Sequence, residues 1–403
     1  MSGVRFDLGV PGDVRFGRGR LAEVPGALAA LAVTRVLVVT GRSPARADAT
    51  RAALTAAGCD SVVLPVPGEP TVELVREGVA LARAQRCDGV LGLGGGSALD
   101  AAKAVAVLAA SGADPLDHLE VVGRGVPVTR SGLPCVAVPT TAGTGAEVTR
   151  NAVLSTDGGV GGGGVGGGGV GRGVKVSLRG APLLPRLAVV DPDLLAGLPA
   201  GVVAAGGMDA LTQLIEPFLS ARANPVTDAL ARDGLRRSAR SLRRAFEAGF
   251  GSGGTVGEDL ALASLFGGLC LAGAGLGAVH GFAGVVGGRL QAPHGAVCAA
   301  LLAPTLEVTA RALAERAPRH PAAARLAEVA ALLTGVPGAT AADGVTWVRD
   351  LVTALGLPGL AQHGLTDADA APVVDAAARA SSMKAHPIEL TRPELLEILR
   401  AAA

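Results

Sequence analysis

Apolar residues follow two spacings in the first half of the chain. Short runs of aliphatic and β-branched residues predict buried strands at 36–39, 61–66, 89–96 and 133–140. Between them, apolar residues recur every three or four positions, as in 71–86, which predicts helices. This alternation of strand and helix predicts a parallel sheet that is covered on both faces.

Beyond about residue 194 the spacing is helical throughout, and the Pro- and Gly-rich stretch 192–200 separates the two patterns. We therefore expect an α/β domain over 1–193 and an all-helical domain over 194–403. The apolar stretch 260–288 is rich in Gly and Ala and contains a histidine, which predicts buried core helices rather than a membrane span. Residues 158–173 are almost all Gly and Val, which predicts a mobile insertion in the first domain. A flap over a nearby site is one interpretation, and the favoured one is a low-complexity expansion that a surface turn tolerates.

Composition narrows the class of protein. Hydrophobic residues make up 49% and charged residues 18%, which suits a packed globular interior, and the net charge is only +1. With 2% aromatic residues and no broad basic region, the chain does not resemble a nucleic-acid-binding protein. Charges within the first seven residues argue against a signal peptide.

The five cysteines are scattered and lack a CxxC spacing, which indicates reduced thiols and a cytoplasmic location. Cys298 lies close to His294 in the sequence, which suits a ligand or a nucleophile, but a small residue that fills buried space is the favoured interpretation. We expect a homodimer. Only three lysines occur among 36 basic residues, and Lys103 and Lys175 lie near candidate ligand-binding segments.

Two glycine-rich turns follow predicted strands. In GGGSALDAAK (94–103) a strand leads into a helix, whose free amide groups, together with the Ser97 hydroxyl, suit a phosphate. In PTTAGTGAE (139–147) threonines and glycines follow the next strand. Because ligands of open α/β sheets bind at the carboxyl ends of strands, the two turns together predict a dinucleotide or similar phosphate ligand.

A second group of polar residues lies in the helical half. Asp209 and Gln213 are four residues apart and share a helix face, and His280 and His294 lie in apolar, Gly-rich surroundings. A carboxylate and two imidazoles form a minimal site for a divalent metal. The alternative is a pair of core histidines that are hydrogen-bonded without a metal.

In order along the chain, the segments GGGSALDAAK, PTTAGTGAEVT, VDPDLLAGLP, GMDALTQLIEPF, VHGF and APHGAV resemble the iron-containing (group III) alcohol dehydrogenase family over roughly residues 10–400. The resemblance implies an α/β dinucleotide-binding domain followed by an all-helical domain, the fold that dehydroquinate synthase shares. It implies NAD or NADP as cofactor, a divalent metal (Fe²⁺ or Zn²⁺), and hydride transfer between the nicotinamide and a small alcohol or aldehyde.

The same resemblance assigns roles by position. It places Asp209, Gln213, His280 and His294 at the metal, so that Asp209, His280 and His294 act in catalysis through the metal, with Lys175 near the nicotinamide ribose. It assigns cofactor binding to Gly41, Ser43, Gly95, Gly96, Ser97, Thr140, Thr141, Thr144 and Lys175.

Three positions depart from the family pattern. Gln213 stands where a fourth histidine ligand is usual, which should weaken iron binding and leaves Zn²⁺, weakly held Fe²⁺ or metal loss open. Gly284 stands where many members have a histidine, so a proton relay through that position is absent. Gly41, Arg42 and Ser43 replace the Asp of NAD-preferring members, which favours NADP over NAD.

Two further interpretations compete with the dehydrogenase. One is a lyase similar to dehydroquinate synthase, which also uses NAD and zinc, and the other is a metal-free, non-catalytic homologue. The scarcity of polar residues around His280 favours a modest-sized, weakly polar alcohol or aldehyde as substrate.

Overall fold

The computed structural model describes residues 5–120, 122–156, 175–251, 254–290 and 292–403. The insertion predicted at 158–173 lies outside the described residues. The chain forms two compact units, an α/β unit made of Gly9–Thr141 and Gly145–Leu195, and a helical unit made of Met1–Leu8, Ala142–Thr144 and Ala196–Ala403.

The α/β unit is built on a six-stranded sheet whose strand pairs are all parallel, in the order β1-β8-β5-β4-β2-β3. The strands are β1 (Val14–Phe16), β2 (Arg35–Thr40), β3 (Asp60–Pro65), β4 (Gly89–Gly94), β5 (Cys135–Pro139) and β8 (Leu187–Val190). The predicted fold class, a parallel-sheet domain joined to an all-helical one, is confirmed.

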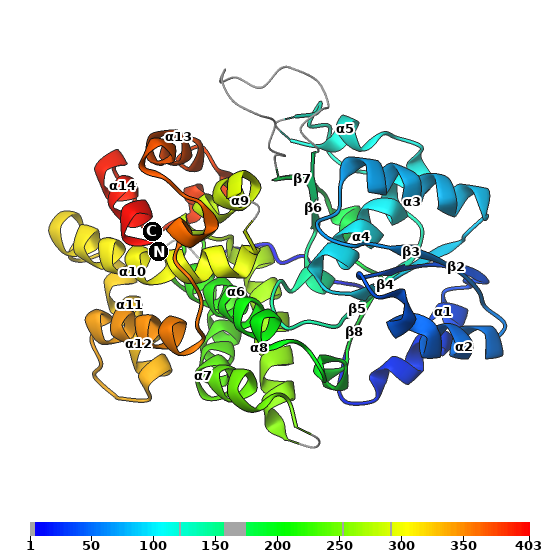
Figure 1. Ribbon diagram of the computed structural model, residues 1–403, viewed down its shortest axis with the longest axis horizontal. Coiled ribbons are helices and arrows are strands. Elements are labelled where there is room, and N and C mark those ends of the chain that lie inside the picture. The colour runs from blue at the N-terminus through cyan, green and yellow to red at the C-terminus, as the bar shows by residue number, and fades with distance from the viewer. Residues whose placement is uncertain (1–4, 121, 157–174, 252–253, 291) are drawn as a thin grey trace. The chain divides into compact units, whose positions relative to one another are not determined.

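Side chains of the central strands alternate between two cores, because successive residues of a strand point to opposite faces. Leu37 and Val39 of β2 pack with residues of α3 (Val72–Ala84) and α4 (Gly96–Ser111). Val36 and Val38 of the same strand pack with residues of α1 (Val24–Ala30) and α2 (Asp48–Ala56). Figure 1 shows the two pairs of helices covering the two faces of the sheet.

A two-stranded antiparallel sheet of β6 (Asn151–Ser155) and β7 (Lys175–Arg179) lies outside the main sheet. The buried ammonium of Lys103 on α4 connects to it, donating to the carbonyl of Asn151 at 2.5 Å and to the Thr149 hydroxyl at 3.0 Å. Lys103 is thus a structural residue that ties α4 to this sheet. Short elements complete the unit: α5 (Pro115–His118), η1 (Arg20–Glu23), η2 (Pro44–Ala47), η3 (Ala146–Val148), η4 (Ala181–Leu183) and η5 (Pro192–Leu195).

The helical unit is arranged around α6 (Ala200–Leu219), whose second half is buried on all sides. It packs against α7 (Pro225–Ala248), α8 (Thr255–Ala274) and α10 (His294–Arg316). The other elements are α9 (Ala278–Leu290), α11 (Pro321–Thr334), α12 (Ala341–Ala354), α13 (Asp367–Ala377), α14 (Arg392–Ala401), η6 (Leu360–His363) and η7 (Ser381–Ala385). Two of these helices, α8 and α10, are long and apolar enough to cross a membrane, but 61% and 78% of their apolar windows are buried inside the protein. Burial of that extent is typical of core helices.

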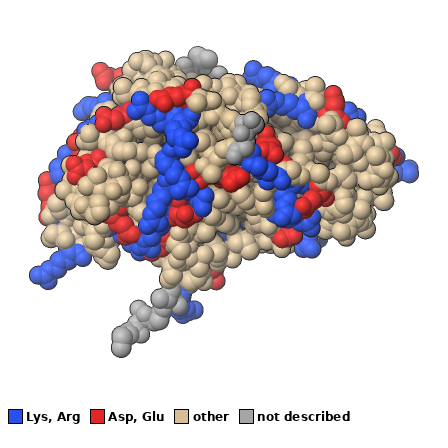
Figure 2. All heavy atoms as spheres, turned by 90° about the horizontal axis from the view of Figure 1, so that it is seen from below, with Lys and Arg blue, Asp and Glu red and all other residues tan. Residues whose placement is uncertain are grey.

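Basic and acidic side chains are interspersed on the face drawn in Figure 2. Exposed ion pairs in the described part of the chain include Arg243 with Glu247 at 2.6 Å and Arg392 with Asp375 at 3.0 Å. The intermixing agrees with the net charge of +1.

Candidate active site

One face of α6 carries a buried row of polar side chains. Asp209, Gln213 and Glu216 follow one another at intervals of four and three residues, so they lie on the same side of the helix. All three are nearly inaccessible to solvent. Because buried polar groups need partners, this row requires complementary groups from neighbouring helices.

Those partners come from the first turns of α9 and α10. His280 lies near the start of α9, His294 is the first residue of α10, and Cys298 follows one turn later. Gly295 allows α10 to approach α6, since a Cβ at this position would lie 1.9 Å from the carbonyl oxygen of Ala205. The close contact of Gly295 with α6, which only glycine permits, therefore brings the neighbouring imidazole of His294 near that helix.

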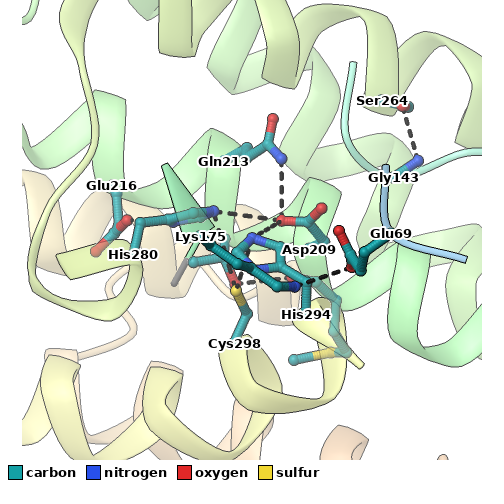
Figure 3. Close-up of polar contacts among 12 residues, drawn as sticks. Glu69, Gly143, Lys175, Asp209, Gln213, Glu216, Ser264, His280, His294 and Cys298 are labelled. Carbon is teal, nitrogen blue, oxygen red and sulfur yellow. Dashed lines mark hydrogen bonds and ion pairs between the residues drawn. The ribbon is translucent and has the colours of Figure 1, made fainter. Parts of the chain in front are cut away.

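The Asp209 carboxylate is the centre of the group (Figure 3). Its Oδ1 lies 2.9 Å from Nε2 of Gln213, 3.3 Å from Nε2 of His280 and 3.7 Å from Nε2 of His294. The Cys298 sulfur lies 3.9 Å and 3.8 Å from the same two imidazole nitrogens. The sequence-predicted residues Asp209, Gln213, His280 and His294 are thus brought together, and Cys298 joins them.

Glu216 sets the tautomer of His280. Its Oε2 lies 2.6 Å from Nδ1 of His280, and its Oε1 accepts a hydrogen bond from the backbone amide of Val279 at 2.7 Å. Burial is the largest single influence on the pKa of Glu216 and raises it, but the hydrogen bond and charge of His280, with smaller contributions from the Gly277 backbone and His386, together hold the pKa below its usual value. An ionised carboxylate can only accept, so Nδ1 carries a proton and Nε2 faces Asp209, as a metal-binding histidine requires.

His386 completes the surroundings of this carboxylate. Its Nδ1 accepts from the amide of Ala278 at 3.3 Å, and its Nε2 lies 3.1 Å from the Thr309 hydroxyl. Burial lowers the pKa of His386 to about 4, so the ring is neutral. The ring is half-buried and lies in the segment just after η7.

The donor set fits a divalent cation. One atom each from Asp209, His280, His294 and Cys298 lies within 4.8 Å of all the others. Burial alone would raise the pKa of Asp209 and of Cys298, but the two imidazoles outweigh it and hold both pKa values below their usual range. A carboxylate, a thiol and two imidazoles grouped in one buried site provide the donor atoms that a metal such as Zn²⁺ or Fe²⁺ needs.

A separate group of sequence-predicted residues gathers in the α/β unit, at the carboxyl ends of three adjacent strands. Gly41 follows β2, Gly95 follows β4, and Thr140 and Thr141 follow β5. A Cβ on Gly94, the last residue of β4, would lie 3.1 Å from the amide nitrogen of Gly41. A Cβ on Gly95 would lie 3.3 Å from the Thr141 side chain. These glycines keep the edge of the sheet free of side chains.

Two features of this edge fit a dinucleotide. Helix α4 begins at Gly96, followed by Ser97, and among the described residues no side chain caps its first turn, so its amide groups can meet a phosphate. The buried hydroxyl of Thr40, at the end of β2, has no hydrogen-bond partner in the described part of the chain. Ser43 is exposed just beyond Gly41 and precedes η2.

The remaining cofactor candidates lie elsewhere. Thr144 belongs to the short segment Ala142–Thr144 that groups with the helical unit. In that segment the amide of Gly143 donates to the Ser264 hydroxyl at 2.8 Å. Lys175 begins β7, and its ammonium forms an ion pair with Glu69 at 2.9 Å within the α/β unit. Its assignment to the nicotinamide ribose therefore stays a prediction.

Comparison with known proteins gives the family. A model of the iron-containing alcohol dehydrogenases matches residues 11–192, and a model of the C-terminal part of that family matches residues 203–403. The chain belongs to the iron-containing alcohol dehydrogenase family. The two matches together span both units described above.

Several members of the family resemble the chain along most of its length. The 1,3-propanediol dehydrogenase of Klebsiella pneumoniae is 32% identical over 416 residues, which cover 100% of each chain. The 4-hydroxybutyrate dehydrogenase of Cupriavidus necator is 33% identical over 345 residues, which cover 84% of each. Among solved structures, a 1,3-propanediol oxidoreductase superposes with a TM-score of 0.87 at 31% identity, over 99% of this chain and 100% of that one.

This membership agrees with the NAD(P)-dependent alcohol dehydrogenase expected from the sequence, and with its use of a divalent metal. A related structure, sulfoacetaldehyde reductase from Bifidobacterium kashiwanohense in complex with NAD⁺, is 25% identical with a TM-score of 0.83 over 99% of each chain. Sequence reasoning missed Glu216 and treated Cys298 as filler. The spacing Asp209–Gln213–Glu216 along one helix face was the available signal for Glu216.

Proposed function

We propose that this protein interconverts a small primary alcohol and its aldehyde with NADP, through a divalent metal held by Asp209, His280 and His294. The reaction removes a hydride from the alcohol carbon to the nicotinamide and releases one proton. The observation that carries the proposal is the buried carboxylate with two imidazole nitrogens 3.3 Å and 3.7 Å away. A bound divalent metal supplies Lewis acidity, which polarises the carbon–oxygen bond of the substrate.

The side chains of the site hold and orient this group. Glu216 keeps the Nδ1 proton of His280 away from the metal side, and Gln213 donates to Asp209 and fixes the rotamer of its carboxylate. His294 is the most exposed of the three proposed ligands, with 32% of its side chain accessible, and it marks the open side of the group. Gly284 carries no proton-transferring group, so the proton exchanges with solvent by another route.

The preference for NADP rests on the segment after β2. Gly41 leaves open space, because a Cβ there would meet no described atom within 4 Å. Arg42 is exposed and donates from Nε to the carbonyl of Pro67, just beyond the neighbouring strand β3, at 3.0 Å. A 2′-phosphate would meet an arginine here instead of a carboxylate. The remaining cofactor assignments, to Ser43, Gly95, Gly96, Ser97, Thr140, Thr141, Thr144 and Lys175, stand as part of the same proposal.

The substrate we propose is weakly polar and of modest size. The core around His280 is apolar, with Val279, Phe282 and Ala283 buried beside it. Relatives named for propanediol and 4-hydroxybutyrate support a short carbon chain with a terminal hydroxyl, whereas the weak polarity that we propose rests on the apolar core alone.

Steady-state kinetics test the proposal. Metal-reconstituted protein should oxidise NADPH in the presence of short aldehydes, and Asp209→Asn should lose that activity while keeping the native circular dichroism spectrum. If no alcohol or aldehyde changes the NADPH or NADH concentration, the proposal is wrong. The outcome would then favour a lyase or a non-catalytic homologue.

We further propose a homodimer in the cytoplasm. Strand β1 forms one edge of the sheet and exposes Val14, with exposed Val10 just before it, which offers an apolar edge to a second copy. All five cysteines lie in the described part of the chain and are free, as suits a reducing compartment. Analytical ultracentrifugation tests the dimer, and cell fractionation tests the location.

A further inference from the structure

We propose that Cys298 is the fourth protein ligand of the metal, as a thiolate, and that the resident ion is therefore Zn²⁺. The inference rests on the proposed function, because it takes Asp209, His280 and His294 as the other three ligands. It assigns to a cysteine of this chain the position that the resemblance left to Gln213.

The separations between the donor atoms match a tetrahedral site. Bond lengths of about 2.0–2.3 Å at tetrahedral angles place neighbouring donor atoms about 3.3–3.6 Å apart. Among these donors, the Cys298 sulfur lies 3.9 Å from Nε2 of His280 and 3.8 Å from Nε2 of His294. The two nitrogens lie 3.3 Å and 3.7 Å from Oδ1 of Asp209. All four atoms lie within 4.8 Å of one another, so a contraction of about one ångström at the widest pair, and of a few tenths at the four pairs above, would bring them into bonding distance of one ion.

Helix α10 places Cys298 beside His294, one of the proposed metal ligands. Cys298 lies four residues after His294 on α10, so both side chains share one face of a rigid helix. Its side chain is fully buried, and both of its polar neighbours are the proposed histidine ligands. Cys270 provides a contrast, since its sulfur lies 3.3 Å from the carbonyl of Thr227.

Gln213 is turned away from this position. Its amide nitrogen donates to Asp209 at 2.9 Å, and its Oε1 is buried without a hydrogen-bond partner among the described residues. That oxygen faces α8, where a Cβ on Gly267 would lie 3.7 Å from it. Figure 3 shows the oxygen pointing away from the sulfur and from both rings. Gln213 is thus a positioning residue for Asp209.

Charge also favours the thiolate. A divalent ion bound by the carboxylate of Asp209 and the thiolate of Cys298 forms a neutral unit, which costs less to bury than a charged one. Binding converts Cys–SH and M²⁺ into a metal–thiolate bond and releases one proton to solvent, with no change of oxidation state. Thiolate ligands select Zn²⁺ over harder ions such as Mg²⁺ and Mn²⁺.

Cobalt substitution provides a direct readout of the sulfur. Co²⁺ bound to a thiolate shows an intense near-ultraviolet charge-transfer band that nitrogen and oxygen ligands do not produce. We expect this band in the wild-type protein and in Cys270→Ser, and we expect Cys298→Ser to lose it while keeping the weaker visible bands of bound Co²⁺. We also expect Cys298→Ser to weaken Zn²⁺ binding by more than the ~10–100-fold that loss of an outer hydrogen bond typically causes.

Zinc X-ray absorption of the wild-type protein needs no variant and so does not depend on the folding of Cys298→Ser. We expect one sulfur at about 2.3 Å and otherwise nitrogen and oxygen. A shell of nitrogen and oxygen alone, or a cobalt band that persists in Cys298→Ser, would overturn the inference. If the wild type reduces aldehydes with NADPH but lacks the sulfur signal, only the cysteine ligand is wrong. If it binds neither Co²⁺ nor Zn²⁺, the proposed metal site fails as well.

Discussion

The hydrogen bond between Glu216 and His280 predicts that Glu216→Gln weakens Zn²⁺ binding. The carboxylate accepts two hydrogen bonds at once, from Nδ1 of His280 at 2.6 Å and from the amide of Val279 at 2.7 Å. An amide side chain of the same size has one acceptor and one donor, so it can satisfy only one of these partners. If the oxygen of the substituted side chain accepts from His280, the NH₂ group of that side chain faces the backbone N–H of Val279, and two donors then meet.

If the oxygen instead stays on Val279, the amide group donates to Nδ1 of His280. The imidazole proton then moves to Nε2, the atom that we assign to the metal. Either arrangement has a cost, since an unsatisfied buried donor destabilises by about 1–3 kcal/mol. Loss of an outer hydrogen bond to a ligand lowers metal affinity about 10–100-fold, or roughly 1.4–2.8 kcal/mol.

Competition with a chromophoric chelator measures this loss for Zn²⁺, and chemical denaturation of the metal-free protein measures stability separately. Glu247→Gln is the matched control, because Glu247 is half-exposed and forms its ion pair with Arg243 on the same helix. We expect the control to bind Zn²⁺ like the wild type. A Glu216→Gln protein whose Zn²⁺ affinity stays within about twofold of wild type would refute the argument. If Glu216→Gln then lowered only the free energy of unfolding, Glu216 would stabilise the fold without orienting His280 for the metal.

Three further substitutions, the first with a control variant, test the surroundings of Glu216, a buried carboxyl group and the cofactor segment. Gly277→Ala would place a Cβ 2.8 Å from Oε1 of Glu216, so we expect it to destabilise the fold by about 1–3 kcal/mol and to weaken Zn²⁺ binding. At Gly284 a Cβ would meet open space, so the control Gly284→Ala should change neither quantity. Chemical denaturation measures the stability, and chelator titration measures the Zn²⁺ affinity. Burial raises the pKa of Glu147 to about 7, so the folded state keeps a proton that the unfolded state loses above pH 4.5. The free energy of unfolding should therefore fall by about 3 kcal/mol between pH 4.5 and 8. Denaturation midpoints measured across this range should show the fall in the wild type and not in Glu147→Gln. Gly41→Asp fits the open space after β2 and should lower the NADP-to-NAD ratio of kcat/KM at least about tenfold, and an unchanged ratio would place the 2′-phosphate elsewhere.

Much of the fold follows from local patterns. The continuous apolar run Val36–Val39 was enough to predict a buried strand, and the helical spacing after residue 194 predicted helices in the second half of the chain. Strands β1, β6, β7 and β8 were not predicted, because each is only three to five residues long and carries too little pattern. Their existence depends on the neighbouring strands that supply hydrogen bonds.

The sequence by itself determined which residues of α6 share a face, because a separation of four residues in a helix brings Asp209 and Gln213 together wherever that helix packs. It also determined the Gly-rich strand ends of the α/β unit. The tertiary structure decided which side chains meet Asp209. Gly295 lets α10 approach the backbone of α6, and this approach brings Cys298, 89 positions along the chain, to the two imidazoles. Such a contact depends on how two helices cross, and no spacing along the sequence specifies that crossing.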